Sequence, residues 1–248
     1  LVPFLSTFSV FASLRSADQL HTDICYQNIN AKVIATHAGT SFGQAGSTHH
    51  AICDMAVIRS MPNITLICPA DGVETAEAVQ AAYDNFGPYY IRINRGFDRV
   101  LYGKDYGKEY KFEVGKAIEV NPGTDITVIA CGSCVYQAYQ AAKFLENADG
   151  LKVRVLDMHT IKPLDTEMIL KCARETGNIV TVEEHSINGG LGSAVAEVVC
   201  ECCPVPVLRV GVEDKFGKSG KVPALLEAYG LTTENIVAKA KAAIAAKK

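Results

Sequence analysis

Short apolar runs alternate with segments of helical periodicity through the first part of the chain. The alternation predicts a βαβαβ order, with elements at residues 32–39, 49–61, 64–71, 72–86 and 89–95. Residues 33–36 and 64–68 are apolar on both faces, which suits parallel strands covered by helices on each side. The apolar run at residues 1–11 indicates a strand already under way at Leu1, so we expect a fragment or a processed chain.

The same alternation resumes in the second half. Predicted strands lie at residues 125–132, 152–160, 178–185 and 206–212, and predicted helices lie at 135–145, at 165–176, after the Gly-rich turn at 189–193, and at the C-terminus. Residues 100–113 are rich in Gly, Lys and Tyr and follow neither period, which predicts a linker. We therefore predict an α/β protein of two doubly wound domains, at residues 1–105 and 106–248. The first is expected to be mostly parallel and incomplete at its N-terminus.

Composition and charge exclude several classes of function. Hydrophobic residues make up 48% of the chain and charged residues 21%, which is typical of a soluble globular protein, and no apolar stretch is long enough to span a membrane. The formal net charge of −3 offers no basic surface for nucleic acid. The cysteines are odd in number and lie mostly in apolar runs, as at Cys68, Cys131 and Cys200, so we expect buried thiols in a reducing cytoplasm.

Candidate chemistry concentrates in residues 36–50. This segment holds three of the six histidines, His37, His49 and His50, on a Gly-rich loop that leaves a predicted buried strand. Open α/β sheets place their ligands at that end of the strands. A single histidine is more often structural, but two on a glycine loop at a strand end favour a functional site.

Four motifs in this order resemble transketolases. They are Thr7-Phe8-x-x-Phe11; Thr36-His37 with Gly43, Gly46 and Thr48-His49; Asn63-Ile64 with Pro69-Ala70-Asp71 and Glu74; and Ile91 with Arg95. The resemblance covers nearly the whole chain and is strongest to the smaller subunit of split transketolases, whose diphosphate-binding half is a separate polypeptide. It implies a pyrimidine-binding domain followed by a transketolase C-terminal domain. The implied activity is transfer of a two-carbon ketol unit from a ketose phosphate to an aldose phosphate, in carbohydrate metabolism such as the pentose phosphate pathway.

The resemblance also implies how thiamine diphosphate is bound. Its aminopyrimidine ring stacks in this family on aromatic residues that match Phe8 and Phe11. Offset stacking suits a flat heterocycle and adds about 1 kcal/mol beyond burial. The third family aromatic falls on Leu14, which leaves a weaker apolar wall. The alternative is that both phenylalanines belong to the core.

Three further residues match family positions that act on the sugar. His37 and His49 match histidines that bind sugar hydroxyls and help to move protons, so both are candidate catalytic and substrate-binding residues. Arg95 matches the arginine that grips the sugar phosphate. Arg92, three residues earlier on the same predicted strand, is a weaker candidate because it is not the family position.

The chain departs from the family in ways that limit what it can do alone. Ala45 and Gln44 stand where the family commonly has an acidic residue, so acceptor preference is expected to differ. The family glutamate that activates the cofactor would precede Leu1, and the diphosphate and metal motif has no counterpart. The resemblance therefore implies that a partner chain or domain holds the diphosphate and Mg²⁺ or Ca²⁺, in a dimer or heterotetramer. We expect no metal ligand in this chain.

Three other motifs favour structural roles. Cys131 and Cys134 have the spacing of a redox dithiol but end a predicted apolar strand. Cys200, Cys202 and Cys203 with His185 lack a second pair of zinc ligands. The turn at residues 189–193 could cradle a phosphate, but a tight strand-to-helix turn is favoured.

Other functions remain open within this fold. 1-Deoxyxylulose-5-phosphate synthase shares the segments Lys162–Asp165 and Val182–Glu184, but it carries arginine at the position of His37, and its stretch matching Phe8 to Gln19 is shorter. The beta subunits of 2-oxo-acid dehydrogenases lack the two-histidine loop. A non-catalytic assembly module is supported only by Ala45 and Leu14.

Overall fold

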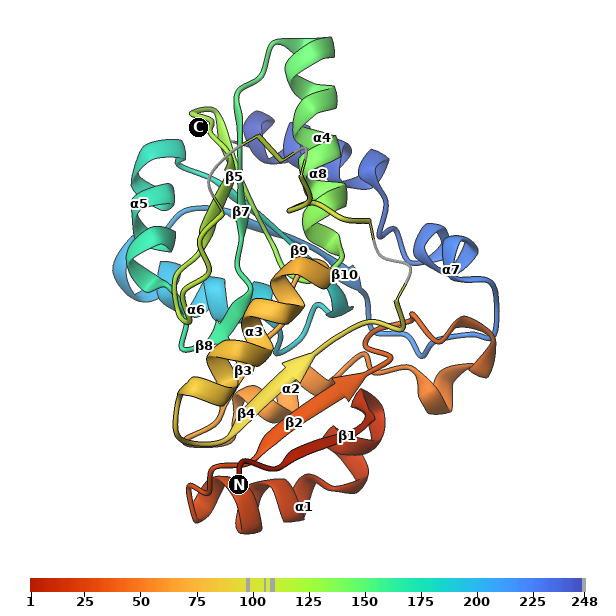
Figure 1. Cartoon of the computed structure of the whole chain (residues 1–248). Helices are drawn as coiled ribbons and strands as arrows, with labels where there is room; N and C mark the ends of the chain where they lie inside the picture. The colour runs from red at the N-terminus through yellow and green to blue at the C-terminus, as the bar shows by residue number, and fades with distance from the viewer. Residues whose placement is uncertain (97–98, 105, 108–109, 247–248) are drawn as a thin grey trace.

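Two five-stranded sheets, each flanked by helices, form the molecule, with the first part of the chain in the lower half of Figure 1 and the second part above it. The computed structural model describes residues 1–96, 99–104, 106–107 and 110–246. The predicted class, α/β with two mostly parallel sheets, is confirmed. The predicted boundary between the domains falls at residue 105, which lies outside the described residues.

The first sheet has the order β1-β2-β4-β3-β8, and all its strands are parallel except β8, which runs antiparallel to β3. The strands are β1 (Phe4–Phe8), β2 (Lys32–Thr36), β3 (Thr65–Ile67), β4 (Tyr89–Arg92) and β8 (Thr160–Lys162). The helices are α1 (Ala17–Gln19), flanked by π-helical turns at Phe11–Arg15 and Leu20–Tyr26, α2 (Asp54–Arg59) and α3 (Gly72–Asp84). Leu66 and Tyr90 pack toward α2, whereas Ile67 and Ile91 pack toward α3, as the two-residue period of a strand requires.

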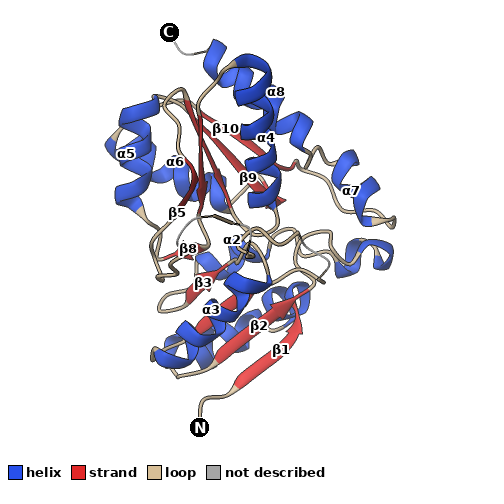
Figure 2. Cartoon of the chain, turned by 45° about the horizontal axis from the view of Figure 1, so that its top comes forward, coloured by secondary structure: helices blue, strands red, loops and turns tan. Residues whose placement is uncertain are grey.

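The second sheet has the order β10-β9-β6-β7-β5, with β5 antiparallel to β7 and the other strands parallel (Figure 2). The strands are β5 (Ile118–Asn121), β6 (Ile126–Ala130), β7 (Val153–Asp157), β9 (Ile179–Ser186) and β10 (Val207–Val212). The helices are α4 (Cys134–Asp149), α5 (Thr166–Thr176), α6 (Leu191–Cys202), α7 (Val222–Ala228) and α8 (Thr233–Ala245).

One hydrophobic core runs through both sheets. It joins Met55 and Leu66 of the first domain to Ile129, Leu156 and residues of α5 and α6 in the second. A separate core lies under α4 and α8. Because the shared core is continuous, the two domains are held in one fixed arrangement, and residues from both can build one site.

Two predicted elements differ from the observed ones. The helix predicted from residue 49 begins only at Asp54, because residues 47–49 form a 3₁₀ turn and Ala51 bridges to Ala38 and Gly39. The strand predicted at residues 152–160 ends at Asp157, and the chain then crosses to the first sheet, where β8 pairs with β3. The three residues of β8 carry no signal that distinguishes one sheet from the other.

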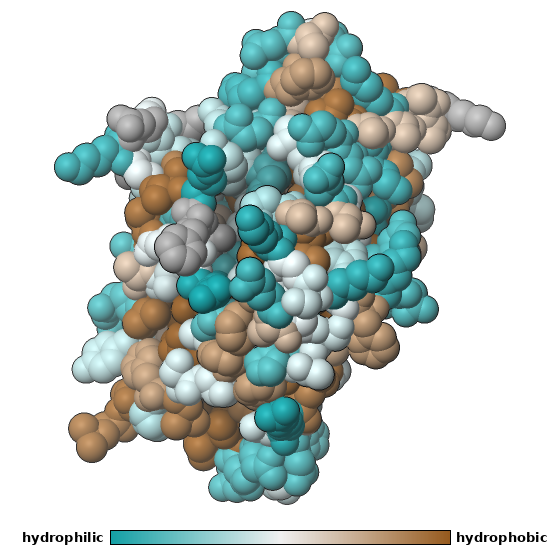
Figure 3. All heavy atoms as spheres, turned by 90° about the vertical axis from the view of Figure 1, so that its right-hand side faces the viewer, coloured by the Kyte–Doolittle hydropathy of each residue, from teal (hydrophilic) through white to brown (hydrophobic). Residues whose placement is uncertain are grey.

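Apolar surface gathers on the lower part of the molecule in Figure 3, where the first domain lies, while hydrophilic residues cover most of the upper part. Strand β1 is an edge of the first sheet, and Phe4 and Leu5 are 39% and 47% exposed. Proteins usually cover apolar sheet edges of this kind by assembly. Over the described ranges, no helix combines the length and hydropathy that crossing a bilayer requires.

The described part of the predicted linker is anchored to both domains. Asp71 caps α3 and also accepts hydrogen bonds from the backbone N–H groups of Leu101 and Tyr102, at 2.7 and 2.8 Å. The Tyr102 hydroxyl donates to Asp157 at 2.7 Å, and the Tyr110 hydroxyl donates to Glu74 at 3.3 Å. The segment therefore packs on a buried acidic cluster.

Glu74 and Asp157 form a buried carboxyl pair at the centre of this cluster. Both side chains are inaccessible to solvent, and the pKa of each responds to the charges of this acidic cluster. Burial raises the pKa of Glu74 well above 4.5, with Asp157 adding to the effect, and burial raises the pKa of Asp157 from 3.8 to about 7. Two carboxylates this close cannot both ionise without cost, so the pair retains a proton at neutral pH.

The carboxyl pair should make the protein less stable as the pH rises. Because the folded-state pKa values exceed the unfolded ones, the stabilisation is complete below about pH 4 and is lost as the pH rises through about 7. We expect Glu74→Gln, which mimics the protonated side chain, to remove roughly 1–3 kcal/mol of the fall in unfolding free energy between pH 4 and 8. Urea titrations at each pH measure this. Glu77→Gln, an exposed change on the same helix, should keep the wild-type slope, and an unchanged slope in Glu74→Gln would contradict the shared proton.

Candidate functional site

A cluster of aromatic and histidine side chains lies at the carboxyl ends of the parallel strands of the first sheet. Phe8 ends β1, and Phe11 begins the turn that follows it. His37 comes directly after β2, and Phe42 and His49 lie in the loop beyond it. This end of an open α/β sheet is where ligands bind.

The rings of the cluster contact one another. The centroid of Phe8 lies 4.2 Å from that of His37, 5.1 Å from Phe42 and 5.6 Å from Phe11. His49 lies 5.3 Å from Phe11 and 5.4 Å from Phe42, and all five side chains are partly exposed. The structure thus brings together the two predicted stacking residues and the two predicted catalytic histidines. It adds Phe42, which the sequence analysis missed although an aromatic residue inside a Gly-rich loop is itself a signal.

Arg95, the predicted phosphate ligand, borders this cluster. Its guanidinium carbon lies 5.3 Å from the centroid of the Phe42 ring, and its backbone N–H donates to the Ser41 hydroxyl at 3.2 Å. The side chain is exposed and follows β4, next to β2 in the sheet. The Arg95 charge is therefore placed beside the histidines.

His37 is held as a neutral imidazole. Burial lowers the pKa of His37 below 6.5, and the positive charge of Arg95 lowers it further. The Thr36 hydroxyl donates to the Thr7 carbonyl at 3.3 Å, so the same oxygen accepts from His37 Nδ1–H at 3.0 Å. This tautomer leaves a lone pair on Nε2. His37 also has a φ of 58°, a left-handed conformation that is uncommon outside glycine and often marks functional sites.

Glu184 of the second domain fixes the start of the histidine loop. Its Oε1 accepts hydrogen bonds from the backbone N–H and the hydroxyl of Thr40, at 2.7 and 2.8 Å. Gly39 is left-handed at φ 59°, and a Cβ there would lie 2.5 Å from the Glu184 carboxyl carbon. A glycine is therefore required at this position. No local pattern in the sequence indicates this contact, because Thr40 and Glu184 are 144 positions apart.

The segment between β10 and α7 holds the other end of the loop. Ser219 donates to the Gln44 carbonyl at 2.7 Å, and Ser47 donates to the Gly217 carbonyl. His50 is buried and donates from Nε2 to the Gly43 carbonyl at 3.1 Å. The third histidine of the loop is therefore structural, unlike the partly exposed His37 and His49.

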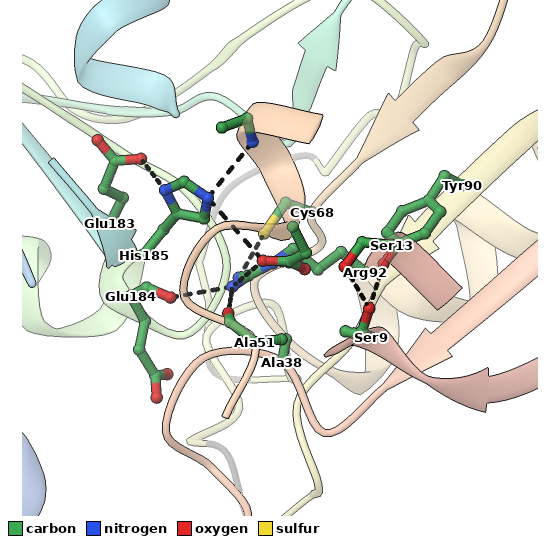
Figure 4. Close-up of polar contacts among 12 residues, drawn as sticks. Ser9, Ser13, Ala38, Ala51, Cys68, Tyr90, Arg92, Glu183, Glu184 and His185 are labelled. Carbon is green, nitrogen blue, oxygen red and sulfur yellow. Dashed lines mark hydrogen bonds and ion pairs between the residues drawn. The ribbon is translucent and has the colours of Figure 1, made fainter. Parts of the chain in front are cut away.

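Arg92 is not available to a substrate. It is buried at the centre of the polar network in Figure 4, where it forms an ion pair with Asp54 at 2.7 Å. It also donates to the carbonyls of Ala51 at 3.0 Å and Glu184 at 2.9 Å. His185 Nε2 lies 4.0 Å from Asp54, on the second-domain side. Arg92 therefore ties the two domains together, which corrects its place as a weaker substrate candidate.

The Cys131 and Cys134 pair has the structural character that was expected, whereas Cys200, which was expected to be a buried thiol, is exposed. Cys131 and Cys134 are buried; a hydrogen bond with Cys68 and burial raise the pKa of Cys131, and burial raises that of Cys134. Such thiols stay protonated and unreactive. Cys200 and Cys202 are exposed at the end of α6, and no group of three potential metal ligands occurs in the described part of the chain.

The turn at residues 189–193 is already filled by the carboxyl group of Glu183. The Glu183 carboxylate accepts from the backbone N–H groups of Leu191 at 2.7 Å and Gly192 at 2.8 Å, in the first turn of α6. A Cβ at Gly190 would lie 2.0 Å from Glu183 Oε2. Because this carboxylate occupies the helix N-terminus, the turn is structural and offers no place to a phosphate.

The cluster suits a flat heterocycle. Phe8 and Phe11 are inclined by 28°, and Phe42 meets Phe8 edge-on, so the rings form a part-open aromatic cradle beside two imidazoles. Leu14, at the position of the third family aromatic, is half-exposed, and Arg15 covers the Phe11 ring at 4.1 Å. The open side of this cradle suits a flat heterocycle such as an aminopyrimidine, next to the imidazole groups.

Comparison with known protein families matches both parts of the chain. Residues 1–97 match the pyrimidine-binding domain of transketolase, and residues 115–236 match the transketolase C-terminal domain. An apulose-4-phosphate transketolase subunit of Phocaeicola vulgatus is 40% identical over 226 residues, which are 91% of this chain and 71% of that protein. A 6-deoxy-6-sulfo-D-fructose transketolase subunit of a Clostridium species is 38% identical over 236 residues, covering 95% of this chain and 72% of the relative.

A solved structure shows the same arrangement of both domains. It is described as a split gene transketolase, an inactive β4 tetramer, and it superimposes with a TM-score of 0.91 at 44% sequence identity. The match covers 100% of this chain and 78% of that chain. The likeness therefore extends to both sheets and to the way they are joined.

Proposed function

Because this chain belongs to the transketolase family and matches subunits of its split type, we propose that it carries the pyrimidine-binding half of a thiamine-diphosphate-dependent ketol transfer site. The observation that carries the proposal is the meeting of Phe8, Phe11, His37, His49 and Arg95 at one end of the first sheet. The aromatic cradle suits a heterocyclic cofactor, the two imidazoles suit a sugar hydroxyl, and the guanidinium suits a phosphate.

The other half of the site belongs to a partner chain or domain. When bound, thiamine diphosphate supplies a nucleophilic carbon that adds to the donor carbonyl. Phe8 and Phe11 would hold its aminopyrimidine ring, while the diphosphate and Mg²⁺ or Ca²⁺ would rest on the diphosphate-binding subunit. Similar proteins are named as subunits, and a similar structure is described as an inactive tetramer. Both descriptions support an active site divided between the chains of a dimer or heterotetramer.

The histidines would move the protons of the reaction. Breaking the bond between C2 and C3 of a ketose turns the C3 hydroxyl into an aldehyde, so that hydroxyl must lose its proton to a base. The lone pair of His37 Nε2 can take it, because the imidazole is neutral at pH 7. When the ketol unit joins the acceptor aldehyde, the proton transfer runs in reverse, from His37 Nε2 to the newly formed hydroxyl. His49, across the cradle, would bind and orient the neighbouring hydroxyls.

Arg95 favours sugars that carry a phosphate, because its planar fork matches phosphate oxygens. The relatives are named for apulose 4-phosphate and for a sulfonated fructose, so both phosphate and sulfonate occur as the distal anion in this family. Ala45 leaves this chain without the acidic side chain usual at that position, so its acceptor is expected to need one hydroxyl contact fewer. His37 favours ketol transfer over the synthase alternative, which has arginine there.

We expect this chain alone to bind thiamine diphosphate weakly and to show no turnover. With the diphosphate and metal contacts missing, the dissociation constant should stay above roughly 0.1 mM even with Mg²⁺. Calorimetry on residues 1–248 tests the binding, and a coupled assay of ketose phosphate with and without a split-transketolase diphosphate-binding subunit tests the activity. Tight Mg²⁺-dependent binding by the chain alone would contradict the divided site, and an assembled complex without activity would favour an assembly module.

A further inference from the structure

A cleft of about 370 Å³ lies next to the candidate site, between the first domain and helices α4 and α7. Its walls include Ser41, Arg95, Arg99, Ser133, Gln137 and Leu226. Arg95 borders both this cleft and the Phe42 ring, which in turn contacts His37 at 4.6 Å. The cleft therefore continues the reaction centre toward the second domain.

The charges on the cleft walls favour an anion. Arg95 and Arg99 both line it, and both residues are exposed. The one carboxylate among the described lining residues is Glu184, and its oxygens already accept hydrogen bonds from Thr40 and Ser133. A bound phosphate would therefore meet two arginines, while the neighbouring carboxylate is compensated by the protein's own donors.

The remaining walls suit a short polyol. Gln137 of α4 has a buried side-chain oxygen with no hydrogen-bond partner within the described part of the chain, and Ser133, which also lines the cleft, directly precedes this helix. The opposite wall is apolar and is formed by Val222, Pro223 and Leu226 of α7. An unpaired buried acceptor is costly unless a ligand or water satisfies it, so a hydroxyl-bearing chain is the fitting occupant.

We propose that Arg99 is a second specificity-determining residue, which joins Arg95 in binding the doubly charged phosphate of an acceptor aldose in this cleft. Two guanidinium groups match a phosphate dianion better than a sulfonate, which carries one charge. The role of Arg99 in acceptor choice rests on the proposed ketol transfer. The anion site itself does not, because all the side chains that form it belong to this chain.

The test titrates D-ribose 5-phosphate into residues 1–248 and follows its ³¹P NMR shift. We expect millimolar binding by the wild type, about tenfold weaker binding by Arg99→Ala, and little loss in Arg99→Lys. Lys221→Ala is the matched control, because it removes one positive charge beside α7 from a residue that does not line the cleft. It should bind as the wild type does, and D-ribose, which lacks the anion, should bind no tighter to the wild type than to Arg99→Ala.

In the assembled enzyme, Arg99→Ala should raise KM for phosphorylated acceptors about tenfold, with kcat nearly unchanged, and should affect a sulfonated acceptor less. Equal binding of ribose 5-phosphate by the wild type and Arg99→Ala, or no binding by the wild type, would overturn the proposal. If the assembled complex shows no ketol transfer but Arg99-dependent phosphate binding persists, the proposed function fails and the anion site stands.

Discussion

Replacing His37 or His49 by alanine should slow ketol transfer by the assembled enzyme by roughly 10²–10⁴-fold, the usual worth of a positioned proton-transfer group. The reason is that His37 presents a neutral Nε2 lone pair where a hydroxyl must lose its proton, and His49 faces the same aromatic cradle. Cofactor affinity should survive both changes, because the heterocycle would rest on the phenylalanines. Steady-state kinetics and titration of thiamine diphosphate measure the two effects separately.

For the phenylalanines we expect the reverse pattern, in which the affinity for the cofactor is the property that falls. Phe8→Ala or Phe11→Ala should weaken cofactor binding by roughly 1–3 kcal/mol, through lost burial and stacking. His21→Ala, an exposed histidine on the π-helical turn beyond α1, should change neither rate nor affinity. Histidine variants with normal turnover would contradict the proton-transfer role, and phenylalanine variants with unchanged cofactor affinity would contradict the stacking role.

Asp54→Asn should destabilise the protein by about 3–5 kcal/mol, a large part of the stability of an ordinary domain. Asp54 and Arg92 are 0% and 2% exposed, so the substitution leaves a buried guanidinium without its counter-charge. Its other acceptors are the carbonyls of Ala51 and Glu184, which carry no full charge, and the Cys68 sulfur at 3.7 Å. Urea denaturation measures the loss.

Two controls separate charge from packing in that experiment. Glu146→Ala breaks the exposed pair with Lys143 on α4, where the loss should stay below about 1 kcal/mol. The double variant Asp54→Leu with Arg92→Met removes both charges and should be more stable than Asp54→Asn alone, because no buried charge is then left unpaired. If Asp54→Asn unfolds at the wild-type urea concentration, the ion pair does not hold the two domains together.

The sequence predicts most of the fold because the strands are apolar on both faces. Val33 and Leu66 lie in runs of that kind, and both end in parallel strands under helices, as the pattern requires. The meeting of Phe8 and His37 follows from the same logic. Phe8 pairs in register with Thr36 on the adjacent parallel strand, so the residue after each strand end reaches the same edge of the sheet.

What the sequence does not reveal depends on contacts between distant segments. Thr40 meets Glu184 across 144 positions, and Gln44 meets Ser219 across 175, so no local pattern signals the clamp on the histidine loop. The same holds for Arg92, which stands on the same predicted strand as Arg95 while its partners come from α2 and β9. Periodicity identifies which residues are buried, but the partner of a buried charge is a property of the folded chain.

Strand β8 limits where this polypeptide can be divided. It follows β7 of the second sheet along the chain but completes the first sheet beside β3. Lys162 at its end donates to the carbonyl of Arg59, the last residue of α2, at 3.1 Å. A break anywhere from residue 99 to residue 159 would separate β3 from β8. The first piece would then have an unpaired edge at β3, and in the second piece β8 would have lost the strand with which it pairs. Gene fission, domain exchange or a truncation in that interval would therefore produce two aggregation-prone fragments. The pyrimidine-binding and C-terminal halves must be expressed and engineered as one unit.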